Sequence, residues 1–253
     1  MRAPRKILVG SRFPAATVTL IAGCLVGFLV ELAQGRALQE FLLRFGVVPL
    51  QLVSYFTGVQ GASLSRSVLP FLSSLFLHGG FVHLLINISF LWIIGDVVED
   101  ALGRVRFVAL FIFGAAAELI VRIGFAGAPS SLPSVGLSGA IAALVGGYVV
   151  VLSWLARASR EPEAGGQGAS PALPLTSRLT LLLGALAWFP LQLLNRCLAL
   201  APTCQTDESV SWVALLISFA LGAFLVSLSG PRRAPASAEA VAFPDEDAAT
   251  LQI

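Results

Sequence analysis

Long apolar runs separated by short polar stretches dominate the pattern along this chain of 253 residues. A membrane-spanning helix needs roughly 20 mostly apolar residues, because about 30 Å of hydrocarbon must be crossed. Six segments reach that length with few charges, and each predicts one span. They cover residues 13–32, 81–98, 105–121, 135–155, 179–198 and 210–228. The pattern therefore predicts an all-α, polytopic membrane helical bundle with six transmembrane helices.

The composition agrees with a membrane protein. Hydrophobic residues make up 57% of the chain and charged residues 12%, with a mean hydropathy of +0.87. An ordinary soluble domain carries about 25% charged residues, so that class is excluded. The first apolar run is too long for the core of a cleaved signal peptide. We expect a cytoplasmic amino-terminal arm over 1–12, one membrane domain over 13–230, and a disordered cytoplasmic tail over 231–253.

The distribution of Lys and Arg predicts the topology. Eleven of them precede the first span, follow the last, or flank the loops after the second and fourth spans, whereas five lie on the other side. By the positive-inside rule both termini are cytoplasmic, which agrees with an even number of spans. We place the protein in a plasma membrane or a bacterial inner membrane. The net charge of +2 follows from this topology, and nothing suggests nucleic acid as a partner.

The connecting segments differ in character. Residues 33–80 mix apolar runs with Gly and Ser, so we expect this stretch to rest in the membrane interface. Residues 156–178 have the composition of a flexible linker. Cys197 and Cys204 fall near the outer end of the fifth span, where they could form a disulfide or remain reduced. Cys24 lies within the first span and is expected to pack or to face lipid.

A few polar residues fall at membrane depth. His78 and His83 are the only histidines of the chain. His83 and Asn87 are four residues apart and therefore share one helix face. Such side chains face a bundle interior or a cavity, so this spacing fits a helix-to-helix contact as well as a functional site. We expect Glu31, at the end of the first span, to snorkel or to contact another helix.

Small residues follow Ser138 at helical spacing. Ser138, Ala142 and Gly146 form one stripe on the fourth span, and the sixth span offers a matching stripe of Ala214, Ser218 and Gly222. Stripes of this kind allow two helix backbones to approach closely. The fourth and sixth spans are therefore predicted to pack tightly against each other.

Two motifs make the chain similar to a known family. Residues 76–103 read FLHGGFVHLLINISFLWIIGDVVEDALG, and residues 131–148 read SLPSVGLSGAIAALVGGY. In this order, and each on the expected span, they resemble the rhomboid intramembrane serine proteases, over roughly residues 67–230. The resemblance implies a rhomboid fold in which Glu99 has a structural role.

The resemblance also implies a role for several side chains. Ser138 corresponds to the family's nucleophile, His83 and Asn87 to its oxyanion-binding positions, and Gly136 to the small residue that lets the backbone pack beside them. The family's general base is a histidine on the sixth span, within an Ala-His pattern. Here Leu215 stands in its place, and no histidine follows Ser138. Loss of the base from a comparable serine hydrolase costs about 10⁶ in rate, roughly 8 kcal/mol.

Few other groups could replace that base. The only lysine, Lys6, lies on the amino-terminal arm. Glu118 lies four residues before Arg122, so we expect the two to pair and do not expect Glu118 to serve Ser138. His83 could act as a surrogate base, at the expense of its oxyanion role.

The sequence therefore predicts a rhomboid-like pseudoprotease that binds transmembrane helices of client proteins in the lipid bilayer without efficient cleavage. The alternatives are an active intramembrane serine endopeptidase that uses His83, and a transporter or channel subunit. No cofactor or metal is predicted. We expect clients to pass along spans two and five, with Trp188 exposed on span five.

Overall fold

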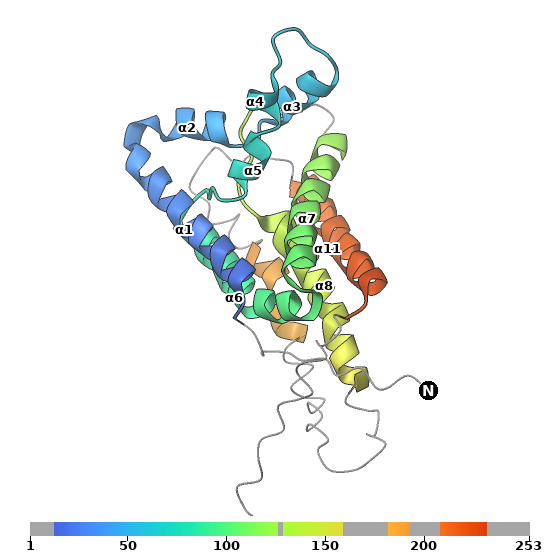
Figure 1. Cartoon of the computed structure of the whole chain (residues 1–253). Helices are drawn as coiled ribbons and strands as arrows, with labels where there is room; N and C mark the ends of the chain where they lie inside the picture. Colours follow the sequence, from blue (N-terminus) through green and yellow to red (C-terminus); the bar gives the residue numbers. More distant parts are fainter. Residues whose placement is uncertain (1–12, 126–128, 159–181, 193–207, 232–253) are drawn as a thin grey trace, which may run out of the picture.

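The computed structural model describes residues 13–125, 129–158, 182–192 and 208–231, and these residues form helices (Figure 1). Up to residue 80 the elements are α1 (Ala15–Gln34), the 3₁₀ turn η1 (Gly35–Ala37), α2 (Leu38–Phe45), α3 (Pro49–Phe56), α4 (Leu64–Ser67) and α5 (Pro70–Ser74). From residue 81 on they are α6 (Phe81–Leu102), α7 (Arg104–Phe125), α8 (Ser138–Ala158), a short apolar helix (Leu182–Gln192) and α11 (Glu208–Ser229). The protein is thus an all-α bundle.

Five helices among the described residues are long and apolar enough to cross a membrane. They run over Ala15–Phe45, Phe81–Leu102, Arg104–Phe125, Ser138–Arg157 and Trp212–Ser229, and they confirm five of the six predicted spans. The predicted span over 179–198 is described only as the helix Leu182–Gln192, which is too short by itself to cross. Several predictions fall outside the described residues. They concern the rest of that range, the arm over 1–12, most of the linker over 156–178, most of the tail over 231–253, and the pair Cys197 and Cys204.

The stretch between the first two spans lies across one end of the bundle. Gly35 ends α1 with a positive φ of 52°, a conformation that favours glycine, and α2 then turns away from the axis of α1 (Figure 1). The helices α2 to α5 gather at the end where α1 and α7 finish. This arrangement is compatible with the interfacial location expected for residues 33–80, which stays a prediction.

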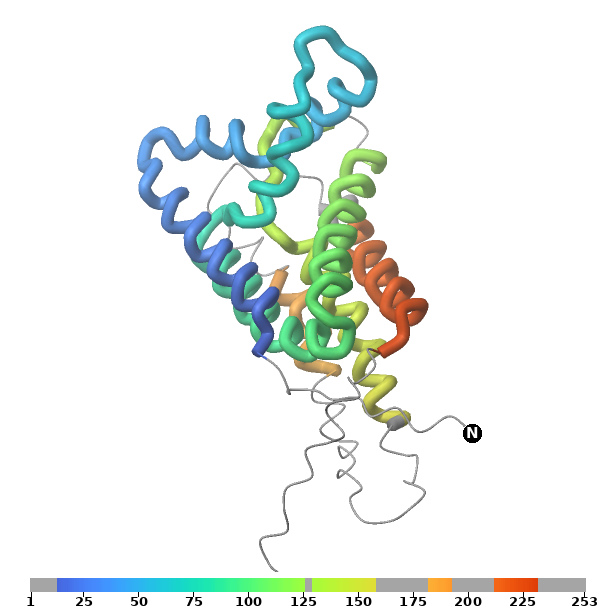
Figure 2. Tube along the Cα trace, in the orientation of Figure 1, coloured from blue at the N-terminus to red at the C-terminus, as the bar shows by residue number. Residues whose placement is uncertain are grey.

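Helix α8 is the centre of the bundle, with α7 and α11 alongside it (Figure 2). Every residue from Gly139 to Tyr148 is buried. A Cβ atom built on Gly146 would overlap the Phe219 carbonyl oxygen, and one on Gly222 would overlap the Ala143 carbonyl oxygen. The predicted close packing of the fourth and sixth spans is thus confirmed, and it depends on these glycines.

At the opposite end of the bundle, Glu99 ties α6 to the start of α1. Its carboxylate accepts hydrogen bonds from the backbone N–H groups of Ala16 (3.0 Å) and Thr17 (2.8 Å) and from the Thr17 hydroxyl (2.9 Å). These donors belong to the first turn of α1, where backbone N–H groups lack partners within the helix. The structural role implied for Glu99 is therefore borne out by its contacts.

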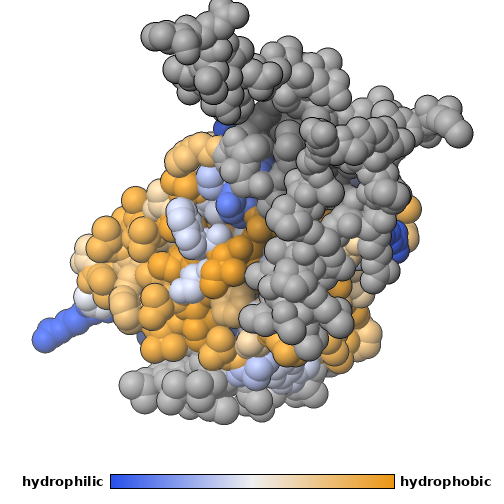
Figure 3. Space-filling model, turned by 90° about the horizontal axis from the view of Figure 1, so that it is seen from below, coloured by the Kyte–Doolittle hydropathy of each residue, from blue (hydrophilic) through white to orange (hydrophobic). Residues whose placement is uncertain are grey.

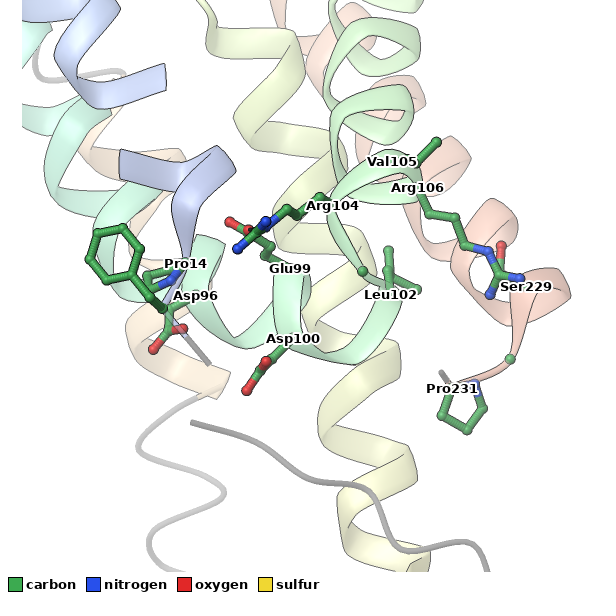
Figure 4. A pocket seen from close by; sticks show the side chains of 13 residues that line it. Pro14, Asp96, Glu99, Asp100, Leu102, Arg104, Val105, Arg106, Ser229 and Pro231 are labelled. Carbon is green, nitrogen blue, oxygen red and sulfur yellow. Dashed lines mark ion pairs between the residues drawn. The ribbon is translucent and has the colours of Figure 1, made fainter. Parts of the chain in front are cut away.

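A cavity of about 750 Å³ lies beside this anchor, between the start of α1, the α6–α7 turn and the end of α11. The Glu99 and Arg104 side chains point toward one another, with nitrogen and oxygen 3.6 Å apart (Figure 4). From this end, apolar side chains cover much of the visible flank, and polar ones gather nearer its centre (Figure 3). Outward apolar side chains such as Ile120, 68% exposed, are those expected to meet lipid.

Candidate functional site

Ser138 begins α8 at the end of a segment that the rest of the fold holds in place. Ser134 and Val47 exchange two backbone hydrogen bonds, of 3.1 and 2.7 Å, and the Gly136 N–H donates to the Ser74 carbonyl at 2.9 Å. The fourth span was predicted from residue 135, but its helix starts at Ser138 because the preceding residues pair with the first loop. This pairing fixes where the serine enters the bundle.

Gly136 and His83 lie in direct contact. Gly136 has a φ of 107°, and a Cβ atom on it would lie 2.7 Å from His83 Cε1 and 3.1 Å from Nε2. Only glycine allows both this backbone conformation and this approach of the ring. The His83 ring is also 5.4 Å from that of His78, in an edge-to-face arrangement. The imidazole of α6 thus packs against the backbone two residues before Ser138.

Asn87, one turn further along α6, is fully buried and contacts the helix Leu182–Gln192. Its Oδ1 accepts a hydrogen bond from Gln192 Nε2 at 3.0 Å. Its Nδ2 has no hydrogen-bond partner among the described residues. Asn87 therefore joins two helices, as the helix-contact interpretation predicts, and the two N–H donors of its Nδ2 are unpaired among the described residues. Sequence reasoning missed Gln192, whose only signal was a polar residue within an apolar run.

Glu118 of α7 is the principal partner of the serine. The Ser138 hydroxyl lies 3.0 Å from both Glu118 Oε1 and Oε2, and the Gly139 N–H donates to Oε2 at 2.6 Å. The predicted Glu118–Arg122 pair is present, at 3.6 Å. Glu118 was not expected near Ser138, yet α7 and α8 pack so closely that it reaches across. That it does not serve Ser138 as a base stays a prediction.

Several hydrogen-bond donors surround the Glu118 carboxyl group. Arg122 lies on one side and donates in turn to the Ser134 hydroxyl at 3.0 Å. On the other side are the Ser138 hydroxyl and the Gly139 N–H, which belongs to the positive end of the α8 dipole. The carboxylate is thus held by two donors of α8 and by the arginine one turn along its own helix.

Leu215 lies near the start of α8 on the neighbouring helix, opposite Gly136 and two residues before the level of Ser138. Three pairs of neighbouring residues fix the register between α8 and α11. From one pair to the next, both residues advance by four positions, so the two helices run parallel. The pairs are Gly139–Ser218, whose members both approach the Gly114 carbonyl oxygen, Ala143–Gly222 and Gly147–Val226. Leu215 is one turn before Ser218 and only 1% exposed. An apolar side chain thus occupies this level of α11, and it can accept no proton.

A small cavity adjoins this group of residues on the α7 side. It has a volume of about 30 Å³ and is lined in part by Ser74, Glu118, Arg122, Ser134 and Gly136. A space of this size has room for about two water molecules, and its lining offers them polar partners. The resemblance also implies that Ser138, His83 and Asn87 converge in one cavity, and this implication stays a prediction.

Two further expectations concern side chains outside this group. Trp188 was expected to be exposed on the fifth span, but it is fully buried. Its neighbour Leu183 is 58% exposed and marks the outward side of the same helix. Cys24 is buried, which agrees with a packing role. Among the described residues, no group of three His, Cys, Asp or Glu side chains could hold a metal ion.

Comparison with known proteins extends these observations. The family model described as "Rhomboid domain" matches residues 65–232. The chain is also similar to "Presenilin-associated rhomboid-like protein A, mitochondrial" of Danio rerio, with 37% identity over 91 residues. That alignment covers 36% of this chain and 23% of the relative, so the chain matches about a quarter of the relative's length.

Proposed function

We propose, because this chain belongs to the rhomboid family, that it is a pseudoprotease that binds transmembrane helices without cleaving them efficiently. The observation that carries the proposal is Leu215, a buried leucine at the position where the family has its base. A serine hydroxyl becomes an effective nucleophile only when a neighbouring group accepts its proton. Among the described residues, the hydroxyl of Ser138 donates to Glu118, which Arg122 also contacts, and no histidine lies on α11.

The proposed architecture has six spans, with both termini in the cytoplasm. The five described spanning helices and the short helix Leu182–Gln192, within the predicted span over 179–198, support that number. The uneven distribution of Lys and Arg supports the orientation.

A cleavage assay tests the absence of activity. Purified protein in liposomes, incubated with a single-span model substrate, should yield no more product than Ser138→Ala. A fluorophosphonate probe that reacts with activated serines should label neither protein. Turnover that Ser138→Ala abolishes would contradict the proposal.

Crosslinking tests the binding. A photoreactive residue at Leu183, or at Trp92 on α6 (60% exposed), should capture single-span membrane proteins, whereas one at Phe113 on α7 should not. Capture should survive Ser138→Ala. Gly184→Trp should reduce it, because Gly184 is exposed and no atom lies within 4 Å of the place that a Cβ would take, so the indole projects outward. Equal capture at all three probe positions would remove the evidence for a specific binding surface.

An active protease that uses Glu118 is the second candidate, and the 3.0 Å contact with Ser138 favours it. In this mechanism the Glu118 carboxylate takes the hydroxyl proton as Ser138 Oγ attacks the peptide carbonyl, and it returns the proton to the leaving amine. His83 would remain an oxyanion donor. Glu118→Gln would then abolish cleavage, while His83→Ala would reduce it. If His83 were the base, the outcomes would be reversed: His83→Ala would abolish cleavage, and Glu118→Gln would only reduce it.

A further inference from the structure

A separate cavity lies where α1 turns into α2, between this corner and the loop that leads into α6. Its volume is about 560 Å³, within the range of sites that bind small molecules. Its walls are mostly apolar, and a single arginine, Arg36, lies among them. The apolar wall residues include Phe28, Leu32, Leu38 and Phe81.

Glu31 lines this cavity and has an acceptor without a partner. The side chain is only 3% exposed. Its Oε1 accepts a hydrogen bond from the His78 backbone N–H at 2.7 Å, whereas Oε2 is buried and has no partner among the described residues. The expectation that Glu31 snorkels toward water was therefore wrong, because the loop before α6 covers it. Its other expected role, contact with a neighbouring segment, is what the bond to His78 provides.

His78 also lines this cavity and has an acceptor without a partner. It is 3% exposed, and its Nδ1 lies 3.3 Å from the Phe76 carbonyl oxygen. A carbonyl oxygen can only accept, so Nδ1 carries the proton and Nε2 of the neutral ring is an acceptor. Burial lowers the pKa of His78 to about 4, which keeps the ring neutral at pH 7. Nε2 is buried and has no partner in the described part of the chain.

Two buried acceptors, one of them a carboxylate oxygen, call for a ligand with several N–H donors and a positive charge. A primary ammonium group has three such donors. A bound metal ion is a poorer match, because no third His, Cys, Asp or Glu ligand joins the pair within the described residues.

Arg36 and the position of the cavity indicate that the ligand also carries a phosphate. Arg36 is exposed at the rim of the cavity and forms no ion pair with any described residue, so its guanidinium can receive a phosphate. The cavity lies at the end of a spanning helix, where phospholipid headgroups are found. We propose that this cavity binds the headgroup of an ethanolamine phospholipid, with the ammonium on Glu31 and His78 and the phosphate on Arg36. This site is independent of any activity at Ser138.

Lipid titration of the delipidated full-length protein, followed by native mass spectrometry, tests the proposal. Phosphatidylethanolamine should bind about tenfold or more tightly than phosphatidylcholine with the same acyl chains, since the quaternary nitrogen of choline has no N–H donor. Phosphatidylglycerol should bind as weakly as phosphatidylcholine. Glycerophosphoethanolamine, which has the headgroup without chains, should bind far more weakly, and equal binding would overturn the assignment to a lipid.

Two variants locate the site. Glu31→Gln keeps an acceptor for the His78 N–H but removes the charge, so the preference for ethanolamine should fall about tenfold. Glu40→Gln, which removes an exposed charge from α2 outside the cavity, should leave it unchanged. Leu38→Trp fills the cavity but leaves the Glu31 and His78 side chains unchanged, and it should also abolish the preference. Equal binding of ethanolamine and choline lipids, or a preference that survives Glu31→Gln or Leu38→Trp, would overturn the proposal.

Discussion

Placing a histidine at position 215 is the most direct test of how the site is organised. Leu215 is buried one turn before Ser218, which places it opposite Gly136, two residues before Ser138, in the register of α8 and α11. Under the proposed correspondence with the family, Leu215→His puts an imidazole where the general base would lie. Leu216, 55% exposed on the same helix, offers a matched control, because Leu216→His directs the same ring away from the bundle.

The expected gain can be worked out from three effects. A positioned base is worth about 10⁶ in rate. The surrounding packing contains a leucine, and a misplacement of the ring by about 1 Å costs roughly 100-fold. The new base must also draw the Ser138 hydroxyl away from Glu118, and a hydrogen bond to a charged group contributes about 1.5–3 kcal/mol, or at least about tenfold. We therefore expect Leu215→His to cleave about 10³-fold more slowly than a complete serine and histidine pair.

Single-turnover cleavage of a single-span substrate in liposomes measures this rate, with Leu215→His/Ser138→Ala as the blank. Adding Glu118→Gln to Leu215→His should raise the rate about tenfold, because the neutral amide competes less strongly for the hydroxyl. A rate for Leu215→His no higher than that for Leu216→His would refute the register argument. A rate equal to that of a complete serine and histidine pair would show that neither misplacement of the ring nor competition by Glu118 slows the reaction.

Three further substitutions test the contacts that hold the fold. Glu118→Gln removes the charge that receives the Ser138 hydroxyl and the Gly139 N–H, so it should lower the free energy of unfolding in SDS titration by about 3 kcal/mol; an unchanged value would mean that this network does not stabilise the bundle. Gly222→Ala places a Cβ on a backbone carbonyl of α8 and should cost about 1–3 kcal/mol, whereas Gly184→Ala, with nothing within 4 Å, should cost none; equal effects would contradict the close packing. Glu99→Gln should expose the start of α1 to proteolysis by weakening three hydrogen bonds, and an unaltered cleavage pattern would count against that anchor.

The outline of the fold could be predicted because hydropathy acts on each segment separately. The spans around Asn87 and Ser138 are continuous apolar runs, and their lengths alone indicate membrane helices. The packing of α8 against α11 was also predictable, since glycine stripes bring backbones together wherever they face each other. Trp188 was not predictable in this way. In a helix that is apolar all round, hydropathy does not distinguish the side facing lipid from the side facing protein.

The contact between Glu118 and Ser138 lies beyond such reasoning for a related physical cause. Spacing within one helix relates Glu118 to Arg122, and that pair was predicted correctly. Whether Glu118 also reaches Ser138 depends on the rotation and distance of α7 relative to α8. Close approach at Gly114 and Gly139 sets both, and neither follows from the periodicity of a single segment.

This contact changes what the serine motif implies about function. The first backbone N–H groups of a helix need acceptors, and an acidic side chain at this end also interacts favourably with the helix dipole. Glu118 provides both for α8, and the Ser138 hydroxyl adds a further donor to the same carboxylate. Ser138, Gly139 and Glu118 can therefore be explained by the stability of the α7–α8 contact, with no catalytic requirement on the serine. It follows that the serine motif alone is weak support for proteolysis in this chain, and that the proposal of a pseudoprotease depends on the assignment of Leu215 to the base position.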